Sequence, residues 1–199
     1  MARTYHYDRK AITDPVVAQP GTIVAQGALV YLRRPLPQDA DRFCTLMLAS
    51  RQLHASWVQP PLSRFEFAGY LKRNRQPDFV GLLVCRREDD DIAGVFNLSN
   101  IVRGALRSAY LGYYAAKAHA GRGYMREGMQ LALRHAFRVL KLHRVEANIQ
   151  PGNAASRALV QGAGFRLEGF SPRYLKIGGR WRDHERWAIL AEEWRPIRS

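Results

Sequence analysis

The sequence predicts a single α/β domain built on a mixed β-sheet. Its 199 residues fit one domain with a terminal extension, and 47% of them are hydrophobic, which is enough to build a buried core. Short strand-like runs alternate with segments of helical periodicity, in the order β-α-α-β-β-β-α-β-α-β-β. We expect residues 28–194 to form this domain, between an irregular extension at 1–27 and a tail at 195–199.

The first strand and helix follow the extension, in which Pro20-Gly21 is a turn signal. A β-rich run begins at Ala28 and is stopped by Pro35. Apolar residues at helical spacing then predict a helix over 38–50.

A second helix and a hairpin come next. Ser63, with Glu66 three residues later, forms a capping-box pattern that opens a helix. Two apolar runs at 79–86 and 92–99 flank an acidic turn at 88–91, so they predict an antiparallel hairpin.

In the second half of the chain, the pattern predicts a strand at 108–115, the longest helix at 122–140 and another strand at 143–149. A helix at 153–161 and a β-rich end at 165–190 follow. Asn153 can cap the later helix. Gly178-Gly179 is typical of a two-residue hairpin turn that needs positive φ angles.

The net charge of +14 admits two interpretations. It favours an anionic partner, such as a phosphate-bearing cofactor, nucleic acid or a nucleoprotein surface, or it reflects an arginine-rich composition. Cys44 and Cys85 cannot build a disulfide framework and suit a reducing compartment. No run of eighteen apolar residues and no secretory signal pattern is present, so we expect a cytoplasmic protein without a membrane span.

Two glycines, Gly121 and Gly123, stand where a predicted strand ends and the longest helix begins. The first amides of a helix lack internal partners and carry partial positive charge, so this position can hold a diphosphate. Arg122 and Arg126 are available as counter-charges. The same pattern can be only a tight turn. Arginine at position 126 excludes a dinucleotide fingerprint, and no Gly-Lys-Ser/Thr follows to make a P-loop.

A glycine cradle, then a strand, then an Asn-capped helix that ends in Gly164-Phe165 resembles the GCN5-related N-acetyltransferase (GNAT) family. The family's Q/R-x-x-G-x-G/A motif falls on 118–123, with Ala118 at its first position. Further phrases resemble the Rim-type ribosomal-protein alanine N-acetyltransferases over roughly 28–194. They are Val102-Arg103-Gly104, Tyr110-Leu111-Gly112-Tyr113, Gly164-Phe165-x-x-Glu168-Gly169 and Gly179-x-Trp181-Arg182-Asp183-His184.

This resemblance implies a mostly antiparallel sheet flanked by helices, in which two strands splay apart around a thioester. It implies an enzyme that transfers the acetyl group of acetyl-CoA to the α-amine of a protein N-terminus. The acceptor is often a ribosomal protein whose N-terminal residue is Ala or Ser. We expect no metal to take part. The residues expected to hold acetyl-CoA are Tyr113, Tyr114, Gly121, Arg122, Gly123, Tyr124, Met125, Arg126 and Asn153. Asn153 either holds the pantetheine arm or only caps its helix.

The resemblance also implies that Ser156 donates a hydrogen bond to the CoA sulfur, since Val160 stands where many family members have a tyrosine. An α-amine has a pKa of about 8, so roughly a tenth of it is neutral at pH 7 and a weak base or a water chain suffices. Glu168 is the best carboxylate for that base, although it can equally be structural. His54 is a weaker candidate.

Two other groups of polar residues complete the analysis. Asp183-His184-Glu185 is interpreted as structural, because in an alternating strand 184 faces away from 183 and 185. Asn97 and Ser99 share one strand face and can bind an acceptor peptide.

Two alternative functions stay open. One is a GNAT enzyme that acetylates a small amine, such as an antibiotic, a polyamine or an amino acid. The other is a basic protein that docks on RNA or the ribosome through its surface, with acetylation secondary. The sequence does not decide between a monomer and a homodimer.

Overall fold

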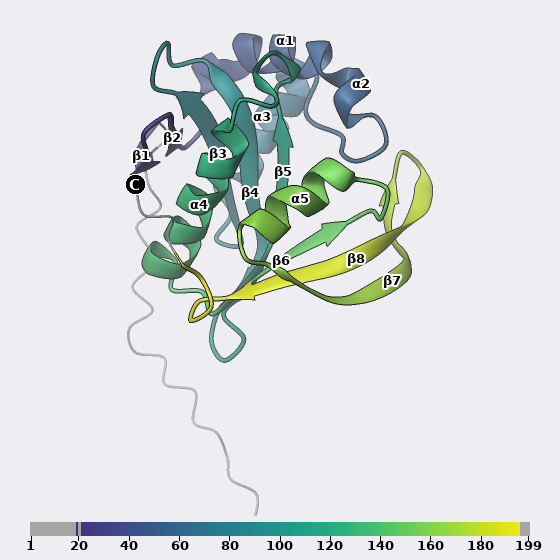
Figure 1. Cartoon of the computed structure of the whole chain (residues 1–199). Coiled ribbons are helices and arrows are strands. Elements are labelled where there is room, and N and C mark those ends of the chain that lie inside the picture. The colour runs from purple at the N-terminus through teal and green to yellow at the C-terminus, as the bar shows by residue number, and fades with distance from the viewer. Residues whose placement is uncertain (1–18, 20, 196–199) are drawn as a thin grey trace, which may run out of the picture.

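The computed structural model describes residues 19 and 21–195, and its centre is one open eight-stranded sheet with helices packed against it (Figure 1). The strand order is β1-β2-β3-β4-β5-β6-β8-β7, and every neighbouring pair is antiparallel except β5–β6. The strands are β1 (Ile23–Gln26), β2 (Val30–Arg33), β3 (Phe79–Arg86), β4 (Ile92–Val102), β5 (Ser108–Ala115), β6 (Arg144–Ile149), β7 (Arg166–Ile177) and β8 (Arg180–Leu190). The predicted fold class is confirmed.

The α-helices are α1 (Ala40–Ala49), α2 (Arg51–His54), α3 (Arg64–Arg73), α4 (Tyr124–Arg134) and α5 (Ala154–Gly162). Short 3-10 turns precede α1 and α4, and a π-helical turn, η3 (His135–Val139), continues α4. The expected helix over 122–140 is therefore divided into an α part and a π part. No helix in the described part of the chain is long and apolar enough to cross a bilayer.

Both faces of the central strands are covered by helices. All eight residues of β3 are buried. Leu82 belongs to one apolar cluster with Met129 of α4, whereas Leu83 belongs to a second cluster with Phe43 of α1. Successive side chains of a strand point to opposite faces, so an unbroken apolar run is what a strand between two helical layers requires.

The described part of the segment expected to be irregular, 19 and 21–27, contains one strand. Ile23–Gln26 forms β1, which pairs with β2. The turn between them is held from α4, because the Glu127 carboxylate accepts hydrogen bonds from the backbone amides of Ala28, Leu29 and Val30. The expectations for residues 1–18, 20 and 196–199 lie outside the described residues.

The predicted splay of two strands is present between β5 and β6. Only three residue pairs join them, ending at Tyr110 opposite Glu146. Beyond that point β5 remains paired with β4 as far as Ala115, and β6 remains paired with β8 as far as Ile149. A gap therefore opens between the ends of two strands that are each held firmly on their other side.

Candidate active site

The start of α4 has the backbone geometry of an anion site. Gly121 and Gly123 have φ angles of 77° and 82°, in the left-handed region that favours glycine. A Cβ at either position would meet no atom of the described residues within 4 Å, so conformation rather than space requires glycine there. Among these residues, no side chain caps the helix, and the Glu127 amide bonds to the Gly123 carbonyl. The preceding amides of the first turn are left to face a ligand.

A groove of about 620 Å³ runs from this helix start to α5 and the end of β5. Its lining includes the loop at 119–123, Tyr113 and Tyr114 of β5, and Asn153 and Ser156 of α5. Arg122 and Arg126 are exposed in it, and neither forms an ion pair with a described carboxylate. The groove thus brings together all the residues expected to hold acetyl-CoA.

Ser156 and Tyr113 form a pair that sequence reasoning did not find. The Ser156 Oγ lies 2.6 Å from the Tyr113 hydroxyl, which also donates to the Ser156 carbonyl at 3.2 Å. Burial raises the pKa of Tyr113 to about 12, so the phenol keeps its proton at neutral pH. A phenol from β5 therefore lies beside Ser156 in the helix that has Val160 where a tyrosine was looked for. Only the fold could show this, because the two residues are 43 positions apart.

Asn153 acts as the predicted helix cap. Its Oδ1 accepts a hydrogen bond of 3.1 Å from the Ser156 amide. The cap fixes the first turn of α5 and so places the Ser156 hydroxyl beside Tyr113.

A second, smaller cavity of about 120 Å³ lies in the gap between β5 and β6. It is lined by Leu111–Tyr113 of one strand, Ala147–Ile149 of the other, and His184 of β8. Five residues line both this cavity and the groove: Trp57, Val58, Tyr113, Asn153 and Ser156. The two spaces therefore meet at the Ser156–Tyr113 pair, where backbone groups of the splayed strands are available to a reacting carbonyl.

The structure does not bring Glu168 to either space. It lies on the outermost strand, β7, where its carboxylate pairs with Arg144 and Arg166. The hydrogen bond from Arg144 is the main cause that lowers the pKa of Glu168. A carboxylate held ionised by two guanidinium groups away from the gap is a poor general base. This geometry argues against the catalytic role expected from the sequence.

The remaining candidates are His54, Asn97 and Ser99. His54 is buried and lines the groove, and its Nε2 donates to the Ala115 carbonyl at 2.8 Å. Asn97 accepts a hydrogen bond of 2.9 Å from the Tyr70 hydroxyl, and Ser99 stands opposite Tyr110. Neither Asn97 nor Ser99 lines the groove or the smaller cavity.

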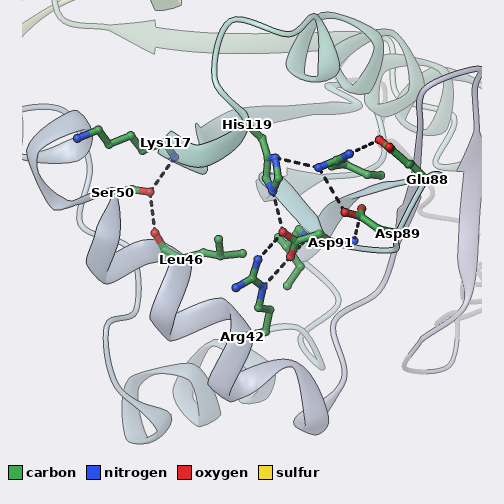
Figure 2. A network of polar contacts seen from close by, with 10 residues as sticks. Arg42, Leu46, Ser50, Glu88, Asp89, Asp91, Lys117 and His119 are labelled. Atoms are coloured by element: carbon green, nitrogen blue, oxygen red, sulfur yellow. Dashed lines mark hydrogen bonds and ion pairs between the residues drawn. The ribbon is translucent and has the colours of Figure 1, made fainter.

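A network of polar side chains contacts residues 117–119, which lead into the loop at 119–123 that lines the groove (Figure 2). Asp91, in the acidic turn between β3 and β4, accepts hydrogen bonds of 2.7 Å from Arg42 Nε and from His119 Nε2. The other ring nitrogen of His119 lies 3.4 Å from the guanidinium of Arg86. Beside this network, the Lys117 amide donates to the Ser50 hydroxyl at 2.9 Å.

We expect Asp91 to contribute both to stability and to the binding of acetyl-CoA. We expect Asp91→Asn to lower the free energy of unfolding by about 2 kcal/mol, because charged hydrogen bonds to Arg42 and His119 are lost. The loop that leads to Gly121 then loses its anchor, so the Kd for acetyl-CoA should rise about fivefold. Urea unfolding and calorimetric titration measure the two effects.

The effect of this substitution should also depend on pH. The Arg42 hydrogen bond is the main cause that holds the pKa of Asp91 well below its usual range. A carboxyl group whose pKa is lowered by folding stabilises the folded state fully at pH values above its unfolded pKa of about 4. This stabilisation is lost as the pH falls from there toward the pKa of the folded state. The difference between wild type and Asp91→Asn should therefore shrink below about pH 4. Asp41→Asn, at a carboxylate that is 67% exposed and pairs with Arg64 outside this network, is the control. Equal stability of both variants would contradict the role of Asp91.

A glycine-led helix start, an adjoining groove and a gap between two splayed strands form the type of site that acyl-CoA-dependent transferases use. The sequence profile of the acetyltransferase (GNAT) domain matches residues 30–166. This protein belongs to that family.

Three relatives illustrate the likeness. The [ribosomal protein uS5]-alanine N-acetyltransferase of Escherichia coli is 40% identical over 111 residues, which are 56% of this chain and 57% of that protein. Mycobacterium smegmatis RimJ in complex with CoA-disulfide has a TM-score of 0.77 at 30% identity and covers 86% of each chain. Vibrio cholerae spermidine N-acetyltransferase in complex with CoA and spermine has a TM-score of 0.72 at 25% identity, covering 84% of this chain and 98% of that one. The chain spans little more than half the length of the first two curated relatives it matches.

Proposed function

We propose that this protein transfers the acetyl group of acetyl-CoA to the α-amine at a protein N-terminus, that of a ribosomal protein beginning with Ala or Ser. The observation that carries this proposal is the junction of the groove and the smaller cavity at Ser156 and Tyr113. Backbone amides at 121–126 hold the diphosphate on one side of the junction. The strand gap admits the amine on the other.

The lining of the smaller cavity favours a peptide acceptor over a polyamine. Its polar side chains include neutral amides, a serine, a tyrosine and a histidine, and none of the described carboxylates lines it. A polyamine carries several positive charges, which such a lining would leave uncompensated. A peptide brings one amine of moderate pKa and backbone groups that amide side chains can bind.

The basic surface fits an acceptor met on a nucleoprotein. Arg173, Lys176 and Arg180 are exposed around the β7–β8 hairpin, and none of them is ion-paired within the described residues. Ribosomal proteins are themselves usually basic, so this charge would repel a free substrate and attract ribosomal RNA. The proposal therefore includes contact with the ribosome.

Acceptor preference is tested with a matched panel and acetyl-CoA. The panel contains peptides with N-terminal Ala or Ser, the same peptides with a blocked N-terminus, and spermidine, with CoA release measured for each. We expect turnover that needs a free N-terminus, and mass spectrometry of ribosomal proteins should show one acetyl group added to an N-terminal peptide. Turnover of spermidine alone would contradict the peptide assignment in favour of a small-amine enzyme.

A further inference from the structure

His184 is a buried histidine that the site described so far does not use. Only 2% of the residue is exposed, and it lines the small cavity together with Asn148, Tyr113 and Ser156. Its strand, β8, pairs with β6 without interruption from Arg144 to Ile149. The position of the ring is thus set by the central sheet rather than by a loop.

The alternation predicted for this strand places His184 on the opposite face from α5. Glu185 lies on the α5 face, where its carboxylate is 3.2 Å from Arg157 Nε. His184 points the other way, and its ring centroid lies 6.0 Å from that of Tyr174 of β7. Since Ser156 belongs to α5, the serine and the histidine approach the strand gap from opposite sides of the sheet.

The hydrogen bonding of the ring defines which nitrogen is free to react. Nδ1 of His184 lies 3.0 Å from the Arg182 carbonyl, which can only accept, so Nδ1 carries the ring proton. In the neutral ring, Nε2 then holds a lone pair. Burial is the main cause that lowers the pKa of His184, and this favours the neutral ring at physiological pH. The titratable or charged groups around it are Tyr174, the neighbouring Asp183, Arg186 two residues along the same face, and Ser156 and Tyr113 across the cavity.

We propose that His184 is the general base that removes the proton from the acceptor amine at the strand gap. The inference rests on the proposed acetyl transfer but not on the identity of the acceptor. The amine nitrogen forms a bond to the thioester carbon, and its proton moves to Nε2 of His184. The carbon–sulfur bond then breaks, and its electron pair leaves with sulfur. Sulfur takes a proton from the Ser156–Tyr113 pair, the pair regains a proton from solvent, and His184 returns the amine proton to solvent. The base thus acts from one face of the sheet and the acid from the other.

Substitution by asparagine separates this role from a structural one. In His184→Asn the side-chain amide can still donate to the Arg182 carbonyl, as Nδ1 does, but no group replaces Nε2. We expect kcat to fall about 100-fold at pH 7 with the Kd for acetyl-CoA changed less than twofold. Below the pKa of His184, the wild-type log kcat/KM should fall more steeply than the titration of the amine alone requires, and the variant should lack this additional fall. His143→Gln, at an exposed histidine immediately before β6, should behave as wild type.

A rescue experiment completes the test. In His184→Ala, added imidazole should restore part of the lost rate, which a purely structural role would not allow. Unchanged kcat and pH profile in His184→Asn, or a lost rate in a folded His184→Ala that imidazole leaves unmoved, would overturn the proposal. If spermidine is turned over in place of peptides and the rate still depends on His184, the peptide assignment fails and the base assignment stands. Transfer to no amine at all would overturn both.

Discussion

Gly123→Glu should abolish measurable binding of acetyl-CoA. Any L residue at this position is strained, because the φ angle of 82° costs a non-glycine residue about 1 kcal/mol or more. The larger effect is electrostatic. The new carboxylate would stand at the start of α4, where the free first-turn amides and the helix dipole stabilise negative charge. It would therefore occupy the anion site itself and repel the diphosphate.

Calorimetric titration should show this loss as a rise in Kd of at least about 100-fold, which corresponds to about 2.7 kcal/mol. Gly104→Glu is the matched control, because Gly104 also has a positive φ, 70°, and lies in the exposed turn after β4. It adds the same charge and the same kind of strain away from the groove, and should leave the Kd unchanged. Equal loss of binding in both variants would show that strain or net charge, rather than the cradle, is responsible.

Ser156→Ala should lower kcat by about 100-fold while the Kd for acetyl-CoA stays within twofold. The hydroxyl is the α5 group that can donate to the departing sulfur, and Tyr113 stands behind it at 2.6 Å. The substitution should not disturb the helix, because the Asn153 cap bonds to the backbone amide of residue 156 and not to its hydroxyl. Stopped-flow measurement of CoA release, with saturating acceptor, gives kcat directly.

Two further variants make this result interpretable. If Ser156 and Tyr113 act as one proton donor, Tyr113→Phe should cost nearly as much as Ser156→Ala, and the double variant little more than either. Ser63→Ala removes the cap of α3 and should cost about 1 kcal/mol of stability with no change in kcat. A full rate in Ser156→Ala would remove the serine from the chemistry.

Local patterns predicted most of the elements. Strands β3 and β5 lie where their apolar runs lie, because each run is bounded by turns and fills a place between helical layers. The cap at Ser63 and the hairpin turn at Gly178-Gly179 follow from side-chain and backbone chemistry within four residues. Strand β1 was not predicted, since its four residues are held by pairing with β2 and by Glu127, which lies 97 to 99 positions away in sequence.

The sequence by itself determined the fold class, the family resemblance and the glycine-led helix start, because each depends on residues close together in the chain. Tertiary structure alone decided how the reacting groups are partnered. In the folded chain, Ser156 contacts Tyr113 and Asp91 contacts His119. Glu168 lies on an edge strand, where it pairs with two arginines, and His184 is buried at the strand gap. The physical reason is that proton affinity and hydrogen bonding depend on burial and on neighbours in space. Strand alternation predicted the direction of His184, but only the packed sheet shows what that direction faces.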